Sequence, residues 1–265
     1  MNNDEHVQHL VEHSIGIGIQ MTLFLPFVLM TFVYIVAVIY SNRTYRRWPL
    51  MRTICLLVGM ICASLAVIGP LADRAHTDFS VHMFAHLLLG MAAPLFIVLS
   101  APMTLLLRTV SVKTARKITA LLKKEIIRFL CDPLFTSIMN IGGLWILYMT
   151  DLFGAMHENS GVFIAIHVHM FLAGYFFTYS MIHIDPNPHR ANFLYRSIVL
   201  VLAIAGHGVL AKYLFANPPS GVAIAMAEEG AKLMYYGGDL IDIAIIFIIC
   251  LQWYKQSRPR MIAHQ

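Results

Sequence analysis

The feature that most constrains the fold of this chain is a series of apolar runs, each long enough to cross a lipid bilayer. About 20 predominantly apolar residues suffice for a transmembrane helix. Such runs occupy residues 17–40, 51–71, 79–100, 133–151, 161–182, 195–215 and 232–254. Hydrophobic residues make up 58% of the chain and charged residues 12%, whereas soluble domains are roughly 45–50% apolar and about 25% charged. We therefore predict an all-α polytopic membrane protein, a bundle of seven transmembrane helices in the lipid bilayer.

The basic residues predict how this bundle is oriented, because Lys and Arg accumulate on the cytoplasmic side of a membrane. Of the 19 Lys and Arg residues, all but Arg74, Lys212 and Lys232 fall in one of the two sets of connections between the runs. This distribution places the N-terminus outside and the C-terminus in the cytoplasm. The net charge of +5 follows from this topology, so we do not interpret it as a nucleic-acid-binding surface.

The connections divide the chain into three parts. Residues 1–16 form an extracytoplasmic segment that carries histidines, residues 17–254 form the membrane domain, and residues 255–265 form a cytoplasmic tail. Within the domain, residues 108–131 place apolar side chains at helical spacing opposite basic ones. That pattern is typical of a helix lying in the inner headgroup region, and a docking site for a partner is the alternative interpretation.

The four cysteines fall in predicted spans or on the cytoplasmic side, so no external disulfide is expected. Cys55 and Cys62 are seven residues apart and share one face of a helix. They could offer soft ligands to Cu(I), although cysteine is equally an ordinary packing residue.

Metal-capable side chains on four different spans lie at one predicted depth. Because an α-helix rises 1.5 Å per residue, counting from the flanking polar residues places them about 10–12 Å inside the outer boundary. The four residues are His86, His169, His207 and Asp239. His82 lies one turn above His86 on the same face, where it would be a further ligand or a relay toward the surface.

Unpaired polar groups are costly in hydrocarbon, so these side chains should face one another and are candidates for a metal site in the bundle core. His167 and His169 are about 200° apart on their helix, so only one can face the common centre, and depth favours His169. Two simpler interpretations stay open. A single intramembrane histidine is often a hydrogen-bonded packing residue, and Asp239 could pair with Lys212, which lies one turn nearer the surface.

Histidine and carboxylate ligands alone suit Zn, Cu, Fe or Ni. Methionines lie beside the histidines in the outer halves of the spans, and their thioethers favour copper, as Cu(I) rather than Cu(II), with zinc as the alternative. These methionines are Met83, Met149, Met170 and Met234. In residues 1–16, His6, His9 and His13 would share one face of a helix and could capture an arriving metal ion.

Four stretches of the chain carry motifs that we consider as one set. They are "SVHMFAHLLLGMAAPLFIVLSAPMTLLLR" from residue 80, "HMFLAGYFFTYSMIHIDP" from residue 169, "HGVL" from residue 207 and "GAKLMYYGGDLIDIAIIFIICLQWY" from residue 230. With these motifs the chain resembles the CtaG-type cytochrome c oxidase assembly factors of the multi-span bacterial kind, over about residues 10–255. His169 falls on a motif position and His167 does not, and Tyr179 stands where the family usually has a Trp.

The resemblance implies a multi-pass protein of the bacterial cell membrane that is needed to make active oxidase. It implies delivery of copper to the oxidase copper centres, with oxidase subunits as partners and without enzymatic activity. The expected metal ligands are His82, His86, His169, His207 and Asp239. The sequence indicates no particular upstream copper donor, and it leaves a homo-oligomer open.

Two other classes of protein use the same residue types. In an intramembrane zinc hydrolase, three protein ligands would leave a fourth position for water, with Asp239 or Asp242 as the base, but the chain has no obvious nucleophile. In a b-type cytochrome, His86 and His207 would be the axial ligands. Three glycines would then give room for the haem ring, namely Gly90, Gly206 and Gly208.

Overall fold

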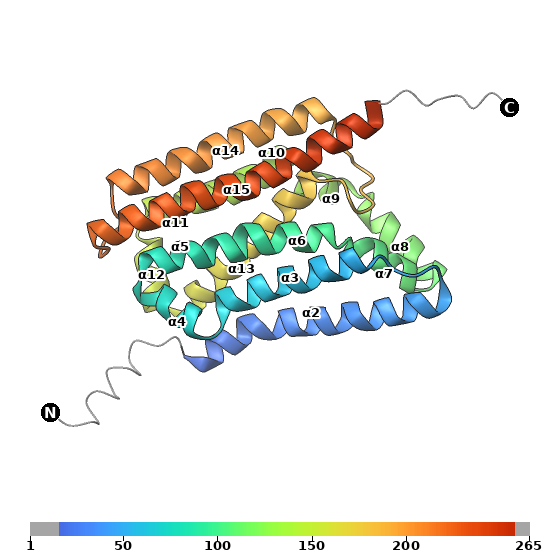
Figure 1. Cartoon of the computed structure of the whole chain (residues 1–265), viewed down its shortest axis with the longest axis horizontal. Coiled ribbons are helices and arrows are strands. Elements are labelled where there is room, and N and C mark those ends of the chain that lie inside the picture. The colour runs from blue at the N-terminus through green and yellow to red at the C-terminus, as the bar shows by residue number, and fades with distance from the viewer. Residues whose placement is uncertain (1–15, 258–265) are drawn as a thin grey trace.

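In the computed structural model, which describes residues 16–257, the chain is a bundle of helices with no β-strand in that range (Figure 1). Within these residues five single helices run between the two ends of the bundle, and two further crossings are each built from three pieces. The single helices are α2 (Ile17–Thr44), α3 (Leu50–Val67), α13 (Ser160–Met181), α14 (Phe193–Ala216) and, last of them, the long helix α15 (Ile224–Ser257). The composite crossings are α5 (Phe79–Leu87), η1 (Leu88–Ala92) and α6 (Ala93–Leu99), and α10 (Pro133–Ser137), η2 (Ile138–Gly142) and α11 (Gly143–Met149).

Short helices lie at the two ends of the bundle (Figure 1). We call one end the α12 end, because it carries α4 (Pro70–Thr77) and α12 (Leu152–Glu158). The opposite end, the α8 end, carries α7 (Pro102–Thr109), α8 (Val112–Leu122) and α9 (Glu125–Leu130). The segment predicted as one amphipathic helix over residues 108–131 is therefore mostly two helices, α8 and α9, that meet near Lys123.

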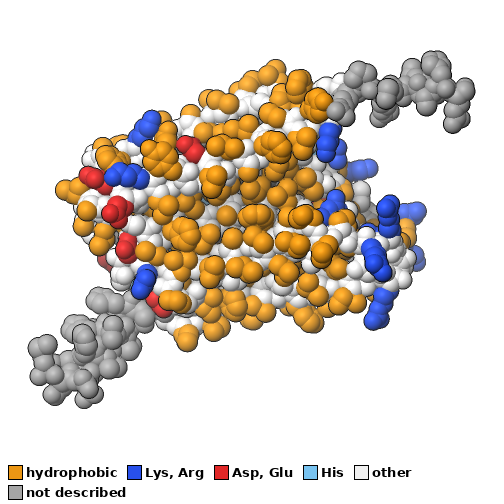
Figure 2. Space-filling view, viewed as in Figure 1, with side chains coloured by type: hydrophobic (Ala, Val, Ile, Leu, Met, Phe, Trp, Pro, Cys, Tyr) orange, Lys and Arg blue, Asp and Glu red, His pale blue; other side chains and the backbone are white. Residues whose placement is uncertain are grey.

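The bundle has the dimensions and surface of a multi-pass membrane protein. Six helices are long and apolar enough to cross a bilayer, and the number is seven if α10–α11 and α12, which are bent by 77°, count as one span. Apolar side chains cover the flank of the bundle between its two ends (Figure 2). The prediction of an all-α polytopic membrane protein is thus confirmed, with six spans, or seven if the bent helix pair counts as one.

The two ends differ in charge. Lys and Arg side chains gather at the α8 end, whereas the α12 end carries acidic side chains and fewer basic ones (Figure 2). The first described helix, α2, begins at the α12 end, and α15 ends at the α8 end (Figure 1). Under the positive-inside rule this arrangement favours an outward-facing α12 end, and the orientation of the termini stays a prediction.

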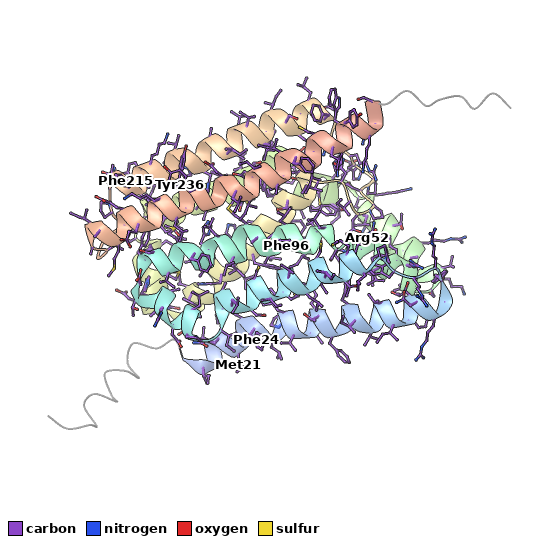
Figure 3. All side chains as sticks on the ribbon, viewed as in Figure 1. Met21, Phe24, Arg52, Phe96, Phe215 and Tyr236 are labelled. Carbon is purple, nitrogen blue, oxygen red and sulfur yellow. The ribbon has the colours of Figure 1, made fainter. Side chains whose placement is uncertain are left out.

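Cations stack on aromatic rings at both ends, in the manner expected where a span meets the headgroups. Phe215 lies near the α12 end and Arg52 toward the α8 end (Figure 3). The Lys232 Nζ atom is 5.4 Å from the centroid of the Phe215 ring, and the Arg52 guanidinium is 4.9 Å from that of Trp48.

The last helix begins earlier than predicted, at Ile224 rather than at residue 232. Residues 224–231 are not apolar enough to be read as a span, because they contain Glu228 and Glu229. They are rich in Ala, Met and Glu, which are strong helix formers. The helix therefore continues past the apolar run.

Each composite crossing contains one turn of π-helix. Pro94 has no N–H to donate to the carbonyl of residue 90, and such a missing donor favours a local widening of the helix at η1. At this point α13 comes very close, because a Cβ added to Gly174 would overlap the carbonyl group of Gly90. Glycine at position 174 is therefore required for the contact between α13 and η1.

Candidate metal centre

The start of α5 fixes the first two candidate ligands. The Asp78 carboxylate accepts hydrogen bonds from the backbone N–H groups of Ser80 at 2.8 Å and Val81 at 3.3 Å, which caps the helix. His82 and His86 follow on the same face, one turn apart, and both are buried. The cap thus fixes where α5 begins, and the helical spacing from that start places both imidazoles on the buried face of the helix.

His86 and His207 form the closest match to the predicted centre. Their side chains are 2% and 4% exposed, and their ring centroids lie 6.5 Å apart with an interplanar angle of 25°. The Nδ1 atom of His86 lies 2.8 Å from the thioether sulfur of Met170. The Nε2 atoms of both histidines are buried and have no hydrogen-bond partner. Two unpaired imidazole nitrogens in a bundle core call for an explanation, because nearly all buried polar atoms are paired.

Both histidines line a small cavity, which we call the His86–His207 cavity. Its volume is about 10 Å³, which is room for a single water-sized particle. Besides the two histidines its wall includes Asp242 on α15, Asn140 on η2 and Met91 on η1. Both π-helical turns therefore border this cavity, and such turns are frequent at functional sites.

Two glycines let neighbouring backbones approach the imidazoles. A Cβ added to Gly238 on α15 would lie 2.5 Å from Cε1 of His207. A Cβ added to Gly90 would lie 3.1 Å from Cγ of Met170 and 3.4 Å from Cε1 of His86. The rings are thus held by close helix packing rather than by hydrogen bonds to their free nitrogens.

His82 is placed differently from His86. Its Nε2 atom lies 3.2 Å from the hydroxyl of Tyr148, and its ring packs against Phe79 and Phe153 at centroid distances of 6.1 and 5.3 Å. This ring has a polar partner, so it is a neighbour of the cavity rather than a second unpaired ligand.

The structure differs from the expectation that His169, rather than His167, faces the shared centre. His167 is buried, and its Nδ1 atom lies 2.8 Å from the carbonyl oxygen of Phe163. His169 is exposed on the opposite side of α13 and lies against Gly143. The buried face of α13 follows Phe163, His167 and Met170 at helical spacing, which depth alone does not reveal.

The carboxylate at the cavity is that of Asp242, about one turn further along α15 than the predicted Asp239. Asp239 is partly exposed and close enough to His207 for an electrostatic interaction, whereas Asp242 is buried and lines the cavity. For Lys212 and Asp239 the structure of residues 16–257 records no ion pair, and the Lys212 Nζ atom lies 5.4 Å from the ring centroid of Tyr235.

Other predicted ligands stand apart from this cavity or outside the described residues. Cys55 and Cys62 are free thiols on α3 and line neither of the cavities that contain His86. His6, His9 and His13 lie outside residues 16–257. In that range no three His, Cys, Asp or Glu side chains come together closely enough to hold one ion, so the five predicted ligands do not form a single cluster.

Comparison with known proteins identifies the family. Residues 32–256 match the model of the cytochrome c oxidase caa3 assembly factors. The chain belongs to this family. It is 25% identical to an uncharacterized protein of Mycobacterium leprae over 245 residues, and 28% identical to one of Mycobacterium bovis over 240 residues. These matches cover 84% and 82% of the chain but 37% and 36% of the relatives, so the chain spans little more than a third of their length. No solved structure matches.

A haem does not fit this assembly factor in the way a b-type cytochrome requires. The cavity lined by His86 and His207 has a volume of about 10 Å³, far too small for a macrocycle. Of the glycines expected to make room, Gly90 does lie against His86, but a Cβ on Gly206 would lie 3.1 Å from Ile141, and one on Gly208 would lie 3.4 Å from Tyr235. A tetrahedral zinc site is a poorer fit than a site with fewer ligands, because zinc takes three or four protein ligands.

The end of the motif that starts at residue 169 has a structural role at the α8 end of this family member. The buried Asp185 carboxylate accepts hydrogen bonds from the N–H groups of Met103 and Thr104, at 3.1 and 2.7 Å, at the start of α7. Nearby, burial and the charges of Arg196 and Arg190 lower the pKa of His183 to about 4. His183 is therefore a neutral packing residue at physiological pH.

Proposed function

We propose that this chain binds Cu(I) between His86 and His207 and supplies it to the copper centres of a cytochrome c oxidase during assembly. One observation carries the proposal. Two buried histidines that line one small cavity each have an Nε2 atom without a hydrogen-bond partner, in a chain of an oxidase assembly family.

The donor set favours Cu(I) over harder ions. Cu(I) prefers imidazole and thioether ligands, and as a d¹⁰ ion it is stable with two or three of them. A single positive charge is also less costly to bury than a double one. Asp242, in the wall of the cavity, would balance that charge.

A site with few ligands suits transfer. A closed four-ligand cage would retain its ion, whereas an ion held by two imidazoles can leave by stepwise ligand replacement to other donors, such as the Met91 thioether in the wall of the cavity. In this proposal copper is a cargo, the oxidase subunits are the recipients, and the chain catalyses no reaction.

The metal content of the purified chain tests the site. We expect His86→Ala and His207→Ala each to lower the copper bound per chain, while His189→Ala, a matched histidine replacement at the α8 end, leaves it unchanged. Elemental analysis after Cu(I) loading under reducing conditions measures the copper bound per chain. Wild-type copper content in both cavity variants, or preferential binding of zinc, would overturn the proposal.

A further inference from the structure

A second group of histidines meets at the α12 end, outside the His86–His207 cavity. His76 comes from α4, His157 from α12 and His167 from α13. The ring centroids of His76 and His157 are 4.7 Å apart, and the His167 ring stacks on Phe163 at 4.0 Å. His82 is close enough to all three for electrostatic interaction. Four helices thus contribute one imidazole each to a single region.

Two of these rings are held in the tautomer that a metal ligand needs. The Nδ1 atoms of His157 and His167 each lie 2.8 Å from the carbonyl oxygen four residues earlier, that of Phe153 and that of Phe163. A carbonyl oxygen only accepts, so each Nδ1 donates and the lone pair stands on Nε2. Histidine ligands of metals are commonly oriented by such a bond from the other ring nitrogen.

A cavity connects this group with the deeper one. It has a volume of about 10 Å³ and is lined by His76, His82, His86 and His167, together with the thioether side chains of Met156 and Met170. His86 also lines the His86–His207 cavity. His86 therefore borders both cavities, with potential ligands around each of them.

We propose that His76, His157 and His167 form an acceptor site for Cu(I) at the α12 end, from which the ion passes to His86 and the deeper cavity. The inference rests on the proposed function, since it supplies the entry step for the same cargo. No three of these side chains converge on one point, so the ion is held by two imidazoles at a time. Each transfer step forms one Cu–N bond and breaks another, without a change of oxidation state.

Anaerobic titration of Cu(I) against a chromogenic Cu(I) chelator tests the acceptor site. Every sample is the full chain with His6, His9 and His13 replaced by alanine, so that ions held by the N-terminal segment do not add to the count. We expect two Cu(I) ions per chain. The variant His157→Phe with His167→Phe keeps aromatic packing but removes the ligand nitrogens, and it should bind one ion and load the deeper cavity at least tenfold more slowly.

The variants separate the two claims. His86→Ala with His207→Ala should also bind one ion, and His189→Ala should bind two. If the Phe variant keeps wild-type capacity and loading rate, the acceptor site is wrong while the deeper site stands. If the Ala variant instead keeps wild-type capacity, the deeper site is wrong. Should the Phe variant fail to fold, His167→Asn removes Nε2 but keeps a donor for the Phe163 carbonyl, and a wild-type loading rate in that variant would again overturn the acceptor site.

Discussion

The Nε2 atoms of His86 and His207 determine what the centre of the bundle can bind. A buried nitrogen without a partner gives up the hydrogen bond it had with water, at a cost of about 1–3 kcal/mol. An arrangement that leaves two such atoms beside one cavity is stabilised by a ligand that accepts both lone pairs. A monovalent soft cation meets that requirement, and the Met170 sulfur, 2.8 Å from Nδ1 of His86, holds the ring from its other side.

Replacing Met170 tests the thioether. Met170→Leu conserves volume, so the fold should persist. Loss of the sulfur removes the contact with Nδ1 that holds the His86 ring, so Cu(I) binding in the deeper cavity should weaken about tenfold, or about 1.4 kcal/mol. Competition with a Cu(I) chelator measures the affinity. Met234→Leu, at a buried methionine that lines neither cavity, is the control. An unchanged affinity in Met170→Leu would mean that the sulfur contact does not orient His86 for copper binding.

His169 gives a contrasting prediction at the same scale. Its side chain is exposed and lies against Gly143, so His169→Ala should keep the wild-type copper content, unlike His86→Ala. Elemental analysis of both purified variants decides the point. Copper loss in His169→Ala equal to that in His86→Ala would mean that α13 is rotated in the copper-bound protein.

At the scale of elements, the centre depends on where regular helices are interrupted. A π-helical turn inserts one residue, which rotates everything beyond it by about 100° relative to an uninterrupted α-helix. The turns η1 and η2 bring Met91 and Asn140 to the cavity, and no hydrophobic pattern predicts such a turn. That His86 and His207 lie close to each other, with ring centroids 6.5 Å apart, was predictable from helical rise alone. The inward direction of His167 was not, because it depends on which helices lie against α13.

Close packing between α13 and η1 gives a prediction of stability. Gly174→Ala would drive a methyl group into the Gly90 carbonyl, and overpacking of this kind costs about 1–3 kcal/mol. The thermal unfolding midpoint in detergent should fall. Gly154→Ala is the matched control, because an added Cβ there meets nothing within 4 Å and alanine favours a helix by about 0.5–1 kcal/mol. Equal midpoints for the two variants would contradict the tight contact.

At the scale of the whole molecule, apolarity was sufficient to predict the bundle and its multi-pass membrane class. It was not sufficient to predict the short helices α4 and α12, which carry His76 and His157. These residues lie outside the apolar runs, so a search for polar groups within the spans passes over them. They meet only because the connections fold back over the end of the bundle.

The orientation of the bundle in the membrane is a prediction about the whole molecule. If the bent pair is the seventh crossing and the basic α8 end faces the cytoplasm, a tag after Gln265 should be accessible only from the cytoplasm and a tag before Met1 only from outside. Labelling of intact cells with a membrane-impermeant reagent measures both. Two tags on one side would mean an even number of crossings and would change the side from which each histidine group is reached.

The central claim is that oxidase copper comes through this chain, and the copper content of the oxidase itself tests it most directly. The oxidase is purified from a strain that lacks this protein, and its ratio of copper to haem is compared with that of the wild-type enzyme. We predict an oxidase that contains its polypeptides and haem but is poor in copper, with the defect retained when His86→Ala with His207→Ala is supplied and removed by the wild-type chain. A copper-replete, active oxidase in the deletion strain would contradict the account.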